Sequence, residues 1–578
     1  MTNDGGTEQI GSLIRQLRRQ RNITQTALGA SHYSKSYISG IEKNIIRPSP
    51  KALEFFATQL GLPRDYFTAF LERPASRKQE PHPFAEQSIQ DEGFLLLHLL
   101  RKHTDPNARV PDELPPLATA LSPSKQGNYF LLEALITQEK QEHDAALHAL
   151  ERALPLVSAQ LQPAVLDAMG QHYYLKRSYA IALHYHHRAL TLLKQATSLE
   201  PERGLLFPVA LHCGEDYRFL GAYSQACEMY DLARSYLHAE QEMKSATLLY
   251  LGWGYCTYAL SCQAAAQVLA ARELAPLPLE EMERLFQRAI TLAIQSRDVC
   301  QLSGDQKGEA TARLLLAVTL LDLSTWRMQL IRVVGEALPT SYLTLLEDAE
   351  EQCRQVLLSC QDMLKHADAS AAPDDVTIYA ALGYLVRTFI QHATLARLSR
   401  NDDTASRERA LAALVCQRAL DALGEPAFPQ AMLEATLTIR AERPVDGAPV
   451  LPCLPDLAEE APAFRSRLPG RVEVYWAAGE VSEELGRTAT SSVDARDSYK
   501  CADRCFQTAL TLAGSIVSSH EREPGYLVRL HQHYALLLQE RSTSAPDVGE
   551  ETSRTLAVLL TDGLAQVQNA IISAQVSL

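Results

Sequence analysis

The chain has 578 residues, of which 46% are hydrophobic, and it carries a formal net charge of −14 at pH 7. This length predicts several domains or one long repeat array, and the apolar content is sufficient for folded cores. The sequence contains no long uncharged apolar run and no basic-then-apolar leader, so we expect no membrane span and a cytoplasmic protein. Its 11 cysteines are scattered without a C-x-x-C pair, which indicates reduced, buried thiols rather than a disulfide framework.

The stretch from Thr24 to Pro50 is typical of a helix-turn-helix followed by the start of a further helix. Thr24 and Ser34 are good N-caps, because a hydroxyl oxygen accepts a backbone N–H at a helix start. Ser49 before Pro50 is a third start signal. Three short helices are therefore predicted, with Leu28 buried by the first.

The second of these helices is expected to have one buried face and one outward face. Ile38 and Ile41 share the apolar face at i, i+3 spacing. The outward residues are small or polar: Lys35, Ser36, Ser39 and Gly40. Such residues suit a helix that enters the DNA major groove and touches base edges.

Further apolar stripes predict a five-helix head over residues 1–73. An earlier helix has Ile10, Leu13, Ile14 and Leu17 on one face, a fourth helix has Leu53, Phe56 and Leu60, and a last helix runs from Pro63 through Phe70. The head holds 10 Lys and Arg against 6 Asp and Glu, whereas the remainder is strongly acidic. This division indicates that only the head contacts nucleic acid.

The segments IRQLRRQRNITQTAL, SKSYISGIEKN and RPSPKALEFFATQLG follow one another in this head. Together they resemble the Cro/C1-type (Xre-family) DNA-binding domain. The turn between Leu28 and Ser34 is one residue shorter than usual, as in peptide-pheromone regulators, and Tyr33 stands where glycine is common. Asn44 replaces the usual glycine after the recognition helix, which asparagine tolerates.

The resemblance implies roles for individual residues of the head. It assigns base reading to Lys35, Ser36 and Gly40. It assigns phosphate contacts to Gln25, Lys43 and Arg47. The complete predicted DNA-binding set is Thr24, Gln25, Ser34, Lys35, Ser36, Ser39, Gly40, Lys43, Asn44 and Arg47.

After a proline-bearing linker at 74–90, a repeat occupies residues 91–245 and is clearest over 126–240. Small residues recur at fixed offsets with aromatic residues between them. The clearest unit has Gly214, Tyr217, Gly221, Tyr223, Ala226, Tyr230 and Ala233, and the preceding unit has Gly170, Tyr173, Tyr179, Ala182, His186 and Ala189. This pattern resembles the tetratricopeptide (TPR) repeat, in which stacked helical hairpins bury a shared core.

The pattern decays beyond residue 245, and we expect degenerate TPR-like hairpins over 246–423. A proline-rich segment at 424–470 predicts an irregular insertion, and residues 471–578 predict C-terminal hairpins with a capping helix over 555–574. No useful β alternation occurs. The predicted fold is therefore all-α, with a helix-turn-helix head and a TPR-like α-solenoid.

First helices of TPR hairpins line a concave groove, which can hold an extended peptide. By repeat phase the groove-lining residues are Gln138, Asp167, Gln171, Tyr174, His212, Glu215, Arg218 and Phe219. Taken singly, each is more simply an ordinary solvated or inter-repeat residue. Collectively they favour a groove that binds a peptide or protein.

Catalytic patterns are lacking, with neither a G-x-x-x-x-G-K-[ST] phosphate loop nor a G-x-S-x-G elbow. His184 and His187 share a helix face, but their place in a repeat favours packing over metal binding. Cys353 and Cys360 are better explained by core packing than by redox sensing. We predict no catalytic residue, metal or cofactor, and no enzyme.

A Cro/C1-type head on a TPR body resembles the peptide-sensing (RRNPP-type) transcription factors. The resemblance implies a homodimer that binds a double-stranded DNA operator and is controlled by a peptide or protein effector in the TPR groove. The alternative is a protein-binding TPR scaffold tethered through its helix-turn-helix head, without a peptide ligand.

Overall fold

The computed structural model describes residues 14–15, 18, 23–29, 32–42, 46, 48–60, 122–195, 200–237, 243–270, 276–334, 341–366, 375–423, 430–438, 468–519, 522–545 and 548–560. The chain divides into two compact units, residues 1–86 and 87–578. The predicted last helix of the head, the linker at 74–90 and most of the proline-rich insertion lie outside the described residues. The limits of 1–73 and 74–90 stay predictions.

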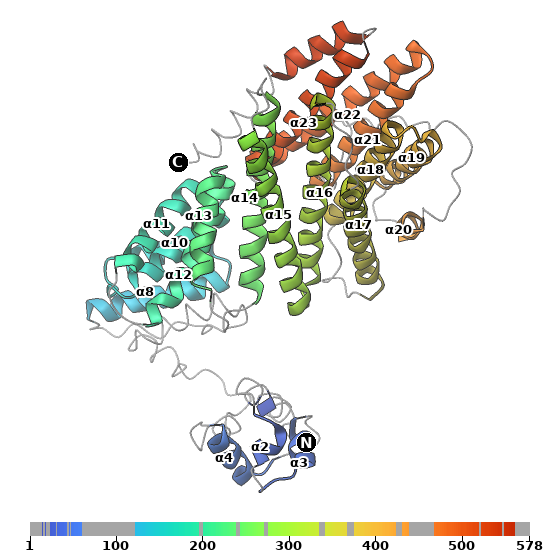
Figure 1. The fold of residues 1–578 in the computed structure, drawn as a ribbon. Helices are drawn as coiled ribbons and strands as arrows, with labels where there is room; N and C mark the ends of the chain where they lie inside the picture. Colours follow the sequence, from blue (N-terminus) through green and yellow to red (C-terminus); the bar gives the residue numbers. More distant parts are fainter. Residues whose placement is uncertain are drawn as a thin grey trace. The chain divides into compact units, whose positions relative to one another are not determined.

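Within the described residues of the N-terminal unit, three short helices lie at the predicted places. They are α2 (Gln25–Gly29), α3 (Lys35–Glu42) and α4 (Pro50–Gln59) (Figure 1). The cap predictions are confirmed, because Ala27 N–H donates to Thr24 Oγ1 over 3.1 Å, Tyr37 N–H to Ser34 Oγ over 3.2 Å, and Ala52 N–H to Ser49 Oγ over 3.3 Å.

One small apolar core holds this unit together. Its fully buried members include Ile14, Leu28, Ile38, Ile41, Leu53, Phe56 and Leu60, as the sequence predicts. Tyr33 adds to it in the short turn, where its ring stacks on Tyr37 at 5.3 Å and meets Phe56 at 5.3 Å. The aromatic ring thus fills space beside the core at a position where glycine is common.

The described part of the second unit opens with three helical hairpins. Their helices are α8 (Pro123–Glu139), α9 (His143–Ala153), α10 (Gln162–Leu175), α11 (Tyr179–Gln195), α12 (Glu200–Phe219) and α13 (Tyr223–Ser235). The predicted repeat positions explain the packing, since Ala182, Ala189, Ala226 and Ala233 are fully buried and let neighbouring helices approach.

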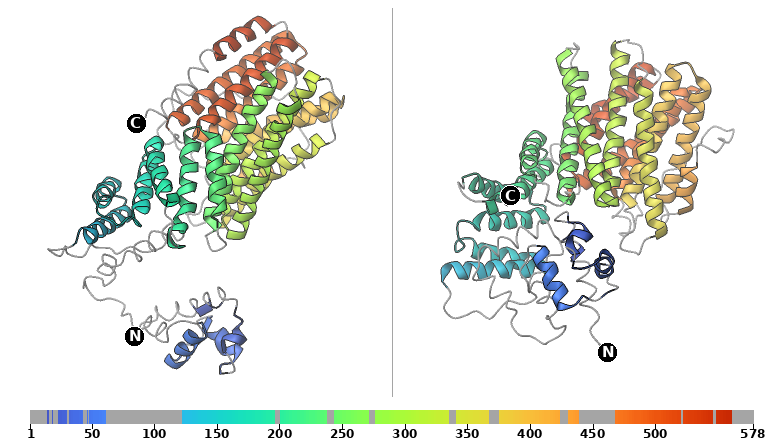
Figure 2. Two further views of the ribbon diagram at one scale, coloured as in Figure 1. Left: turned by 60° about the vertical axis from the view of Figure 1, so that its left-hand side comes forward. Right: turned by 60° about the horizontal axis from the view of Figure 1, so that its bottom comes forward.

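Longer hairpins follow. They are built from α14 (Met243–Ala270), α15 (Pro276–Ser303), α16 (Gln306–Val334), α17 (Ser341–His366), α18 (Asp375–Leu398), α19 (Asp402–Leu423), α21 (Leu468–Thr488) and α22 (Ser492–Ser518). Figure 2 (right) shows α14 to α19 standing side by side. No strand occurs in the ranges described above, and the predicted all-α, TPR-like solenoid is confirmed.

Two helices depart from simple hairpin stacking. The short α20 (Gln430–Leu437) lies inside the segment predicted to be irregular and packs on α17. The last labelled helix, α23 (Pro524–Ser544), packs on α22 and α14. Through Arg529 it also reaches Asp322 of α16 and Glu473 of α21, so α23 contacts several helices of the longer hairpins.

The start of α23 returns to the early repeats. Gly525 N–H donates to Tyr223 Oη over 2.6 Å, and Arg218 lies 3.4 Å from Glu523. Arg177 also donates to the Ser519 carbonyl oxygen. These contacts join residues that are 302 to 342 positions apart, which closes the second unit on itself.

None of the helices described above combines the length and apolar character needed to cross a bilayer.

Candidate functional site

Helix α3 presents the first candidate site, a polar face backed by an apolar one. Ile38 and Ile41 fix its inner face in the core, while Ser34 and Lys35 are exposed and Ser39 is half-buried. Thr24, before α2, is also exposed. The helix therefore displays a cationic and hydroxyl-bearing surface suited to phosphate oxygens and base edges.

Gly40 does not face outward, which corrects the expectation for that position. It is buried, and an added Cβ would lie 2.5 Å from Ile46 Cδ1. The glycine thus permits close packing of the segment after α3. The side chains of Ser36, Lys43, Asn44 and Arg47 lie outside the described residues.

Glu42, at the end of α3, organises the polar face from beneath. It is 4% exposed and accepts hydrogen bonds from Arg18 at 2.5 and 3.0 Å and from Gln25 Nε2 at 2.8 Å. Burial raises the pKa of Glu42, but the hydrogen bonds from Arg18 and Gln25 outweigh it, so the pKa is lowered. The carboxylate remains charged and locks Arg18 and α2 onto α3.

A surface depression surrounds this ion pair. It is lined by Arg15, Arg18, Thr24, Gln25, Thr26, Lys35, Ser39 and Glu42. Three cations and four neutral polar residues outnumber the one carboxylate, so the depression favours an anion such as phosphate. The sequence predictions did not include Arg15, Arg18, Thr26 or Glu42. The sequence signal for the two arginines is that they lie off the apolar stripe of the first predicted helix, Ile10 to Leu17.

The predicted groove residues of the body form two polar clusters rather than an open row. In the first, Asp167 is fully buried and its Oδ1 lies 2.8 Å from His212 Nδ1. Gln171 Nε2 lies 3.1 Å from His212 Nε2. Asp167 therefore contributes to the interior between α10 and α12 and not to an accessible surface. Gln138, in α8, is half-buried and belongs to neither cluster.

The second cluster combines aromatic and charged residues of α10 and α12. Arg218 Nη2 donates to Glu215 Oε2 over 2.6 Å, and its guanidinium lies 4.4 Å from the Phe219 ring centre. Tyr174 Oη donates to Glu215 over 3.5 Å. Burial lowers the pKa of Arg218, but the opposite effect of the Glu215 charge is larger, so the pKa is raised and the arginine stays protonated.

Residues remote in sequence complete this second cluster. Tyr230 Oη donates to Glu215 Oε1 over 2.6 Å, and Glu523 of the α23 start faces Arg218. Tyr230 was visible in the repeat pattern as a packing residue. No sequence signal linked Glu523 to these repeats, because the contact depends on the return of α23.

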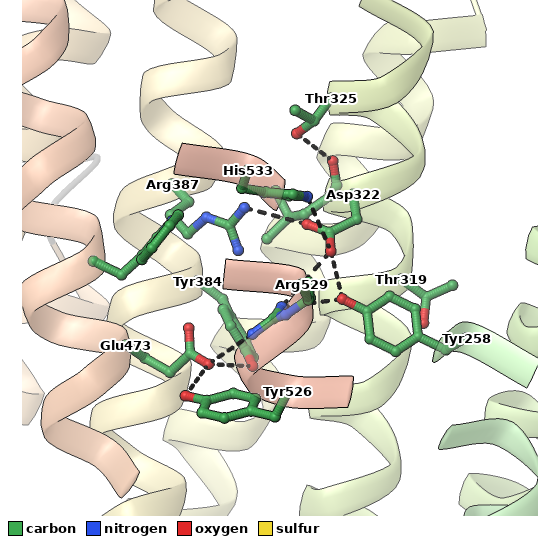
Figure 3. A network of polar contacts seen from close by, with 12 residues as sticks. Tyr258, Thr319, Asp322, Thr325, Tyr384, Arg387, Glu473, Tyr526, Arg529 and His533 are labelled. Carbon is green, nitrogen blue, oxygen red and sulfur yellow. Dashed lines mark hydrogen bonds and ion pairs between the residues drawn. The ribbon is translucent and has the colours of Figure 1, made fainter. Parts of the chain in front are cut away.

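A buried charged network joins α23 to four other helices (Figure 3). At its centre, Asp322 of α16 is fully buried and accepts from Arg387 Nη2 over 3.2 Å and from Tyr258 Oη. Arg529 and His533 of α23 lie 3.7 Å from the same carboxylate. Burial raises the pKa of Asp322, but the charges of these partners lower it to about 2.

Glu473 of α21 forms the second anchor of this network. It accepts from Arg529 over 3.2 Å, from Tyr526 over 2.9 Å and from Tyr384 over 3.2 Å. A cavity of about 70 Å³ adjoins these groups; residues lining it include Tyr255, Tyr258, Tyr384, Arg522, Tyr526 and Arg529. Glu523 also lines this cavity, which connects it to the Arg218 cluster.

Comparison with known proteins identifies the first unit. Residues 14–67 match the helix-turn-helix family model, so the chain carries a Cro/C1-type DNA-binding domain. We found no curated protein sequence that matches the chain.

Several solved structures match this chain at low similarity. Bacillus thuringiensis PlcR, solved in complex with the peptide PapR7 and DNA, is 16% identical with a TM-score of 0.22, covering 49% of this chain and 94% of that chain. BtubC (BKLC) from P. vanneervenii is 11% identical with a TM-score of 0.24, covering 51% and 91%. A circular tandem repeat protein with novel repeat topology is 10% identical with a TM-score of 0.23, covering 98% of each chain. TM-scores this low carry no functional assignment.

Proposed function

We propose that this chain is a sequence-specific transcriptional regulator, in which the helix-turn-helix domain binds an operator and the TPR-like body binds a peptide or protein effector. The observation that carries the proposal is the exposed face of α3, with Ser34 and Lys35 beside a cationic depression, within the matched residues 14–67.

The two kinds of side chain on this face support two kinds of DNA contact. Lys35 and Ser36 are the residues we assign to base edges, because they lie along the recognition helix. Arg15, Lys43 and Arg47 are assigned to phosphates. Phosphate contacts supply affinity and salt dependence, whereas base contacts supply specificity.

A homodimer would present two recognition helices to one palindromic operator. Helix-turn-helix dimers place these helices in half-sites about 34 Å apart, which is one turn of DNA. We propose this arrangement on the basis of the domain type.

For the effector, the Arg218 cluster is the better supported half of the predicted groove. Tyr174, Glu215, Arg218 and Phe219 combine a cation, an anion and aromatic rings that are only partly buried. They lie next to Glu523, which also lines the cavity beside α23. A peptide bound here would compete for the contact between α12 and the start of α23.

The scaffold alternative draws on the placement of α23. Arg529 of this helix contacts Tyr258 of α14, Asp322 of α16 and Glu473 of α21, so α23 would take the place of an extended segment beside these helices. A body filled in this way favours a protein partner on its outer surface over a peptide within.

Two experiments test the proposal. Selection from random duplexes by the full chain is expected to enrich a sequence with two related half-sites, and enrichment of no sequence would contradict DNA reading. Thermal unfolding with fractions of small cell-extract peptides is expected to show a stabilising shift that Arg218→Ala removes. Absence of a shift together with co-purification of one protein would support the scaffold.

A further inference from the structure

Three neighbouring helices of the body bring two imidazoles and a carboxylate together. Asp167 lies in α10, His186 in α11 and His212 in α12, and one ligand atom from each lies within 4.8 Å of the others. Asp167 and His186 are 0% and 1% exposed, whereas the His212 side chain is 23% exposed and gives access from solvent.

The hydrogen bonding of His186 leaves one ring nitrogen directed into this cluster. Its Nδ1 lies 2.6 Å from Asp216 Oδ2, in a buried contact. Its Nε2 is buried, has no hydrogen-bond partner among the described residues, and lies 3.7 Å from Asp167 Oδ1. A buried polar atom without a hydrogen bond is costly unless a ligand satisfies it.

The backbone of α10 is shaped to admit the His186 ring. A Cβ at Gly170 would lie 2.3 Å from both Cδ2 and Nε2 of His186, so no larger residue fits there. At the same offset in the next repeat, Gly214 accommodates Tyr230. The repeat therefore provides a slot for a ring, and this unit fills it with a potential metal ligand.

We propose that Asp167, His186 and His212 bind one divalent transition metal ion, for which Zn²⁺ is the first candidate. Two imidazoles and one carboxylate form a donor set that suits Zn²⁺ and its neighbours in the transition series. The inference concerns a ligand class separate from DNA and peptide, and it does not rest on the proposed function.

Two donor separations, both measured from Asp167 Oδ1, agree with this ligand set. Donors bound at about 2.0–2.1 Å in a tetrahedral site lie roughly 3.3 Å from one another. The observed separations from Asp167 Oδ1 are 2.8 Å to His212 Nδ1 and 3.7 Å to His186 Nε2, which lie on either side of that value. Small side-chain rotations would equalise them, and a water would complete the fourth position.

Asp216 and charge balance give the site its second support. Metal-bound histidines generally donate their other ring N–H to a carboxylate, which fixes the tautomer and orientation, and Asp216 serves His186 in this way. Asp167 and Asp216 are both 0% exposed, so two buried carboxylates flank His186, and a cation is favoured beside them.

The experiment is metal binding to the full chain after treatment with a chelator. Equilibrium dialysis against Zn²⁺ at neutral pH, followed by metal analysis, is expected to give one tightly held ion per chain and a raised unfolding temperature. Co²⁺ as the probe is expected to give a visible absorption spectrum of a low-coordinate site with nitrogen and oxygen ligands.

Matched variants locate the ion. Asp167→Asn and His212→Gln each remove one ligand with little change in shape, and each is expected to weaken binding by at least tenfold. Asp216→Asn is expected to weaken it by about 10- to 100-fold through loss of imidazole orientation. His184→Gln is the control, because His184 lies in α11 with His186 but is exposed. This variant is expected to bind Zn²⁺ as tightly as the wild-type chain does.

Three results would overturn the proposal. One is a correctly folded wild-type chain that shows no saturable Zn²⁺ or Co²⁺ binding. Another is unchanged affinity in both His212→Gln and Asp167→Asn, which would place any bound ion elsewhere. The third is an unfolding temperature of the wild-type chain that does not change with Zn²⁺ at any pH, which would show that the folded cluster holds no metal.

Discussion

His533 shows how strongly burial acts on a single side chain of the body. It is 6% exposed, its ring meets Trp326 at 5.5 Å, and Asp322 lies 3.7 Å from its Nε2. Burial lowers the pKa of His533, and although Asp322 opposes this shift, the pKa is about 4. The neutral imidazole is therefore the form compatible with the fold.

This shift predicts a pH dependence of stability. His533 binds a proton near pH 6.5 in the unfolded chain but only near pH 4 in the folded chain. The contribution of the neutral His533 to the free energy of unfolding is therefore fully present above pH 6.5 and is lost as pH falls toward 4. The loss attributable to this residue is roughly 3 kcal/mol, from about 1.4 kcal/mol per pKa unit.

Denaturant unfolding across this pH range is the measurement for His533→Gln. The variant is expected to lose less stability than wild type on acidification, while the exposed His184→Gln control follows wild type. Equal slopes for wild type and His533→Gln would contradict the assignment. Burial also lowers the pKa of His531 to about 4. His531 therefore adds the same pH dependence of stability to wild type and to His533→Gln, and only the difference between the two proteins reports on His533.

On the DNA-binding side, substitutions are expected to separate specificity from affinity. Lys35→Ala and Ser36→Ala should change the preferred operator sequence, because these residues are assigned to base edges. Arg47→Ala should weaken all duplexes alike and reduce the salt dependence, as loss of a phosphate contact does. Competition binding with single-base operator variants measures both effects; an unchanged base preference in both recognition-helix variants would refute the assignment.

Single residues also show what the sequence can and cannot reveal. Local signals were reliable, and the caps Thr24, Ser34 and Ser49 are where their hydroxyls predict. Gly40 was misplaced because its orientation depends on Ile46, which follows the helix. Asp167 was assigned to a groove by repeat phase, but its burial reflects three converging helices.

At the scale of elements, α23 is held by buried polar contacts near both of its ends. Near its end, Arg541 is 2% exposed and donates to Asp503 over 2.9 Å and to Glu483 over 3.1 Å. Near its start, Arg529 forms ion pairs with Glu473 and Asp322. Because each arginine compensates two carboxylates, removal of either leaves buried negative charge.

Loss of Arg541 is therefore expected to destabilise the docked helix. Arg541→Met should lower the free energy of unfolding by about 3–5 kcal/mol, since breaking a buried pair leaves uncompensated charges. Arg554→Met is the matched control, because Arg554 pairs with Glu550 on the surface and should cost at most about 0.5 kcal/mol. Hydrogen exchange should show faster exchange across α23 in the first variant only, and equal protection in both would contradict this role.

The helices themselves were largely predictable, whereas the path of α23 was not. Small residues at fixed offsets predict hairpins, and pairs such as α14–α15 and α18–α19 occupy stretches where degenerate hairpins were expected. The segment at 424–470 appeared irregular because prolines recur on both sides of the proline-free stretch that forms α20. Periodicity identifies buried faces but not their partners, so the return of α23 to α12 carried no local signal.

At the scale of the whole molecule, the proposed dimer gives a defined stoichiometry. Each chain has a mass of 64.0 kDa, and sedimentation is expected to show twice this mass in solution. On a duplex with two half-sites about 34 Å apart, two chains should bind together, and lengthening the spacer by half a helical turn should abolish joint binding. A single chain bound per duplex at every spacing would argue against the dimer.

The most direct measurement is equilibrium binding of the full chain to its selected duplex and to a scrambled duplex of the same composition, at low and at physiological salt. We predict preferential binding to the selected duplex at both salt concentrations and loss of that preference in Lys35→Ala. The logarithm of the binding constant should fall linearly with the logarithm of the salt concentration. Failure to bind any duplex even at low salt, or equal binding to both duplexes by wild type, would contradict the conclusion that the helix-turn-helix unit reads DNA sequence.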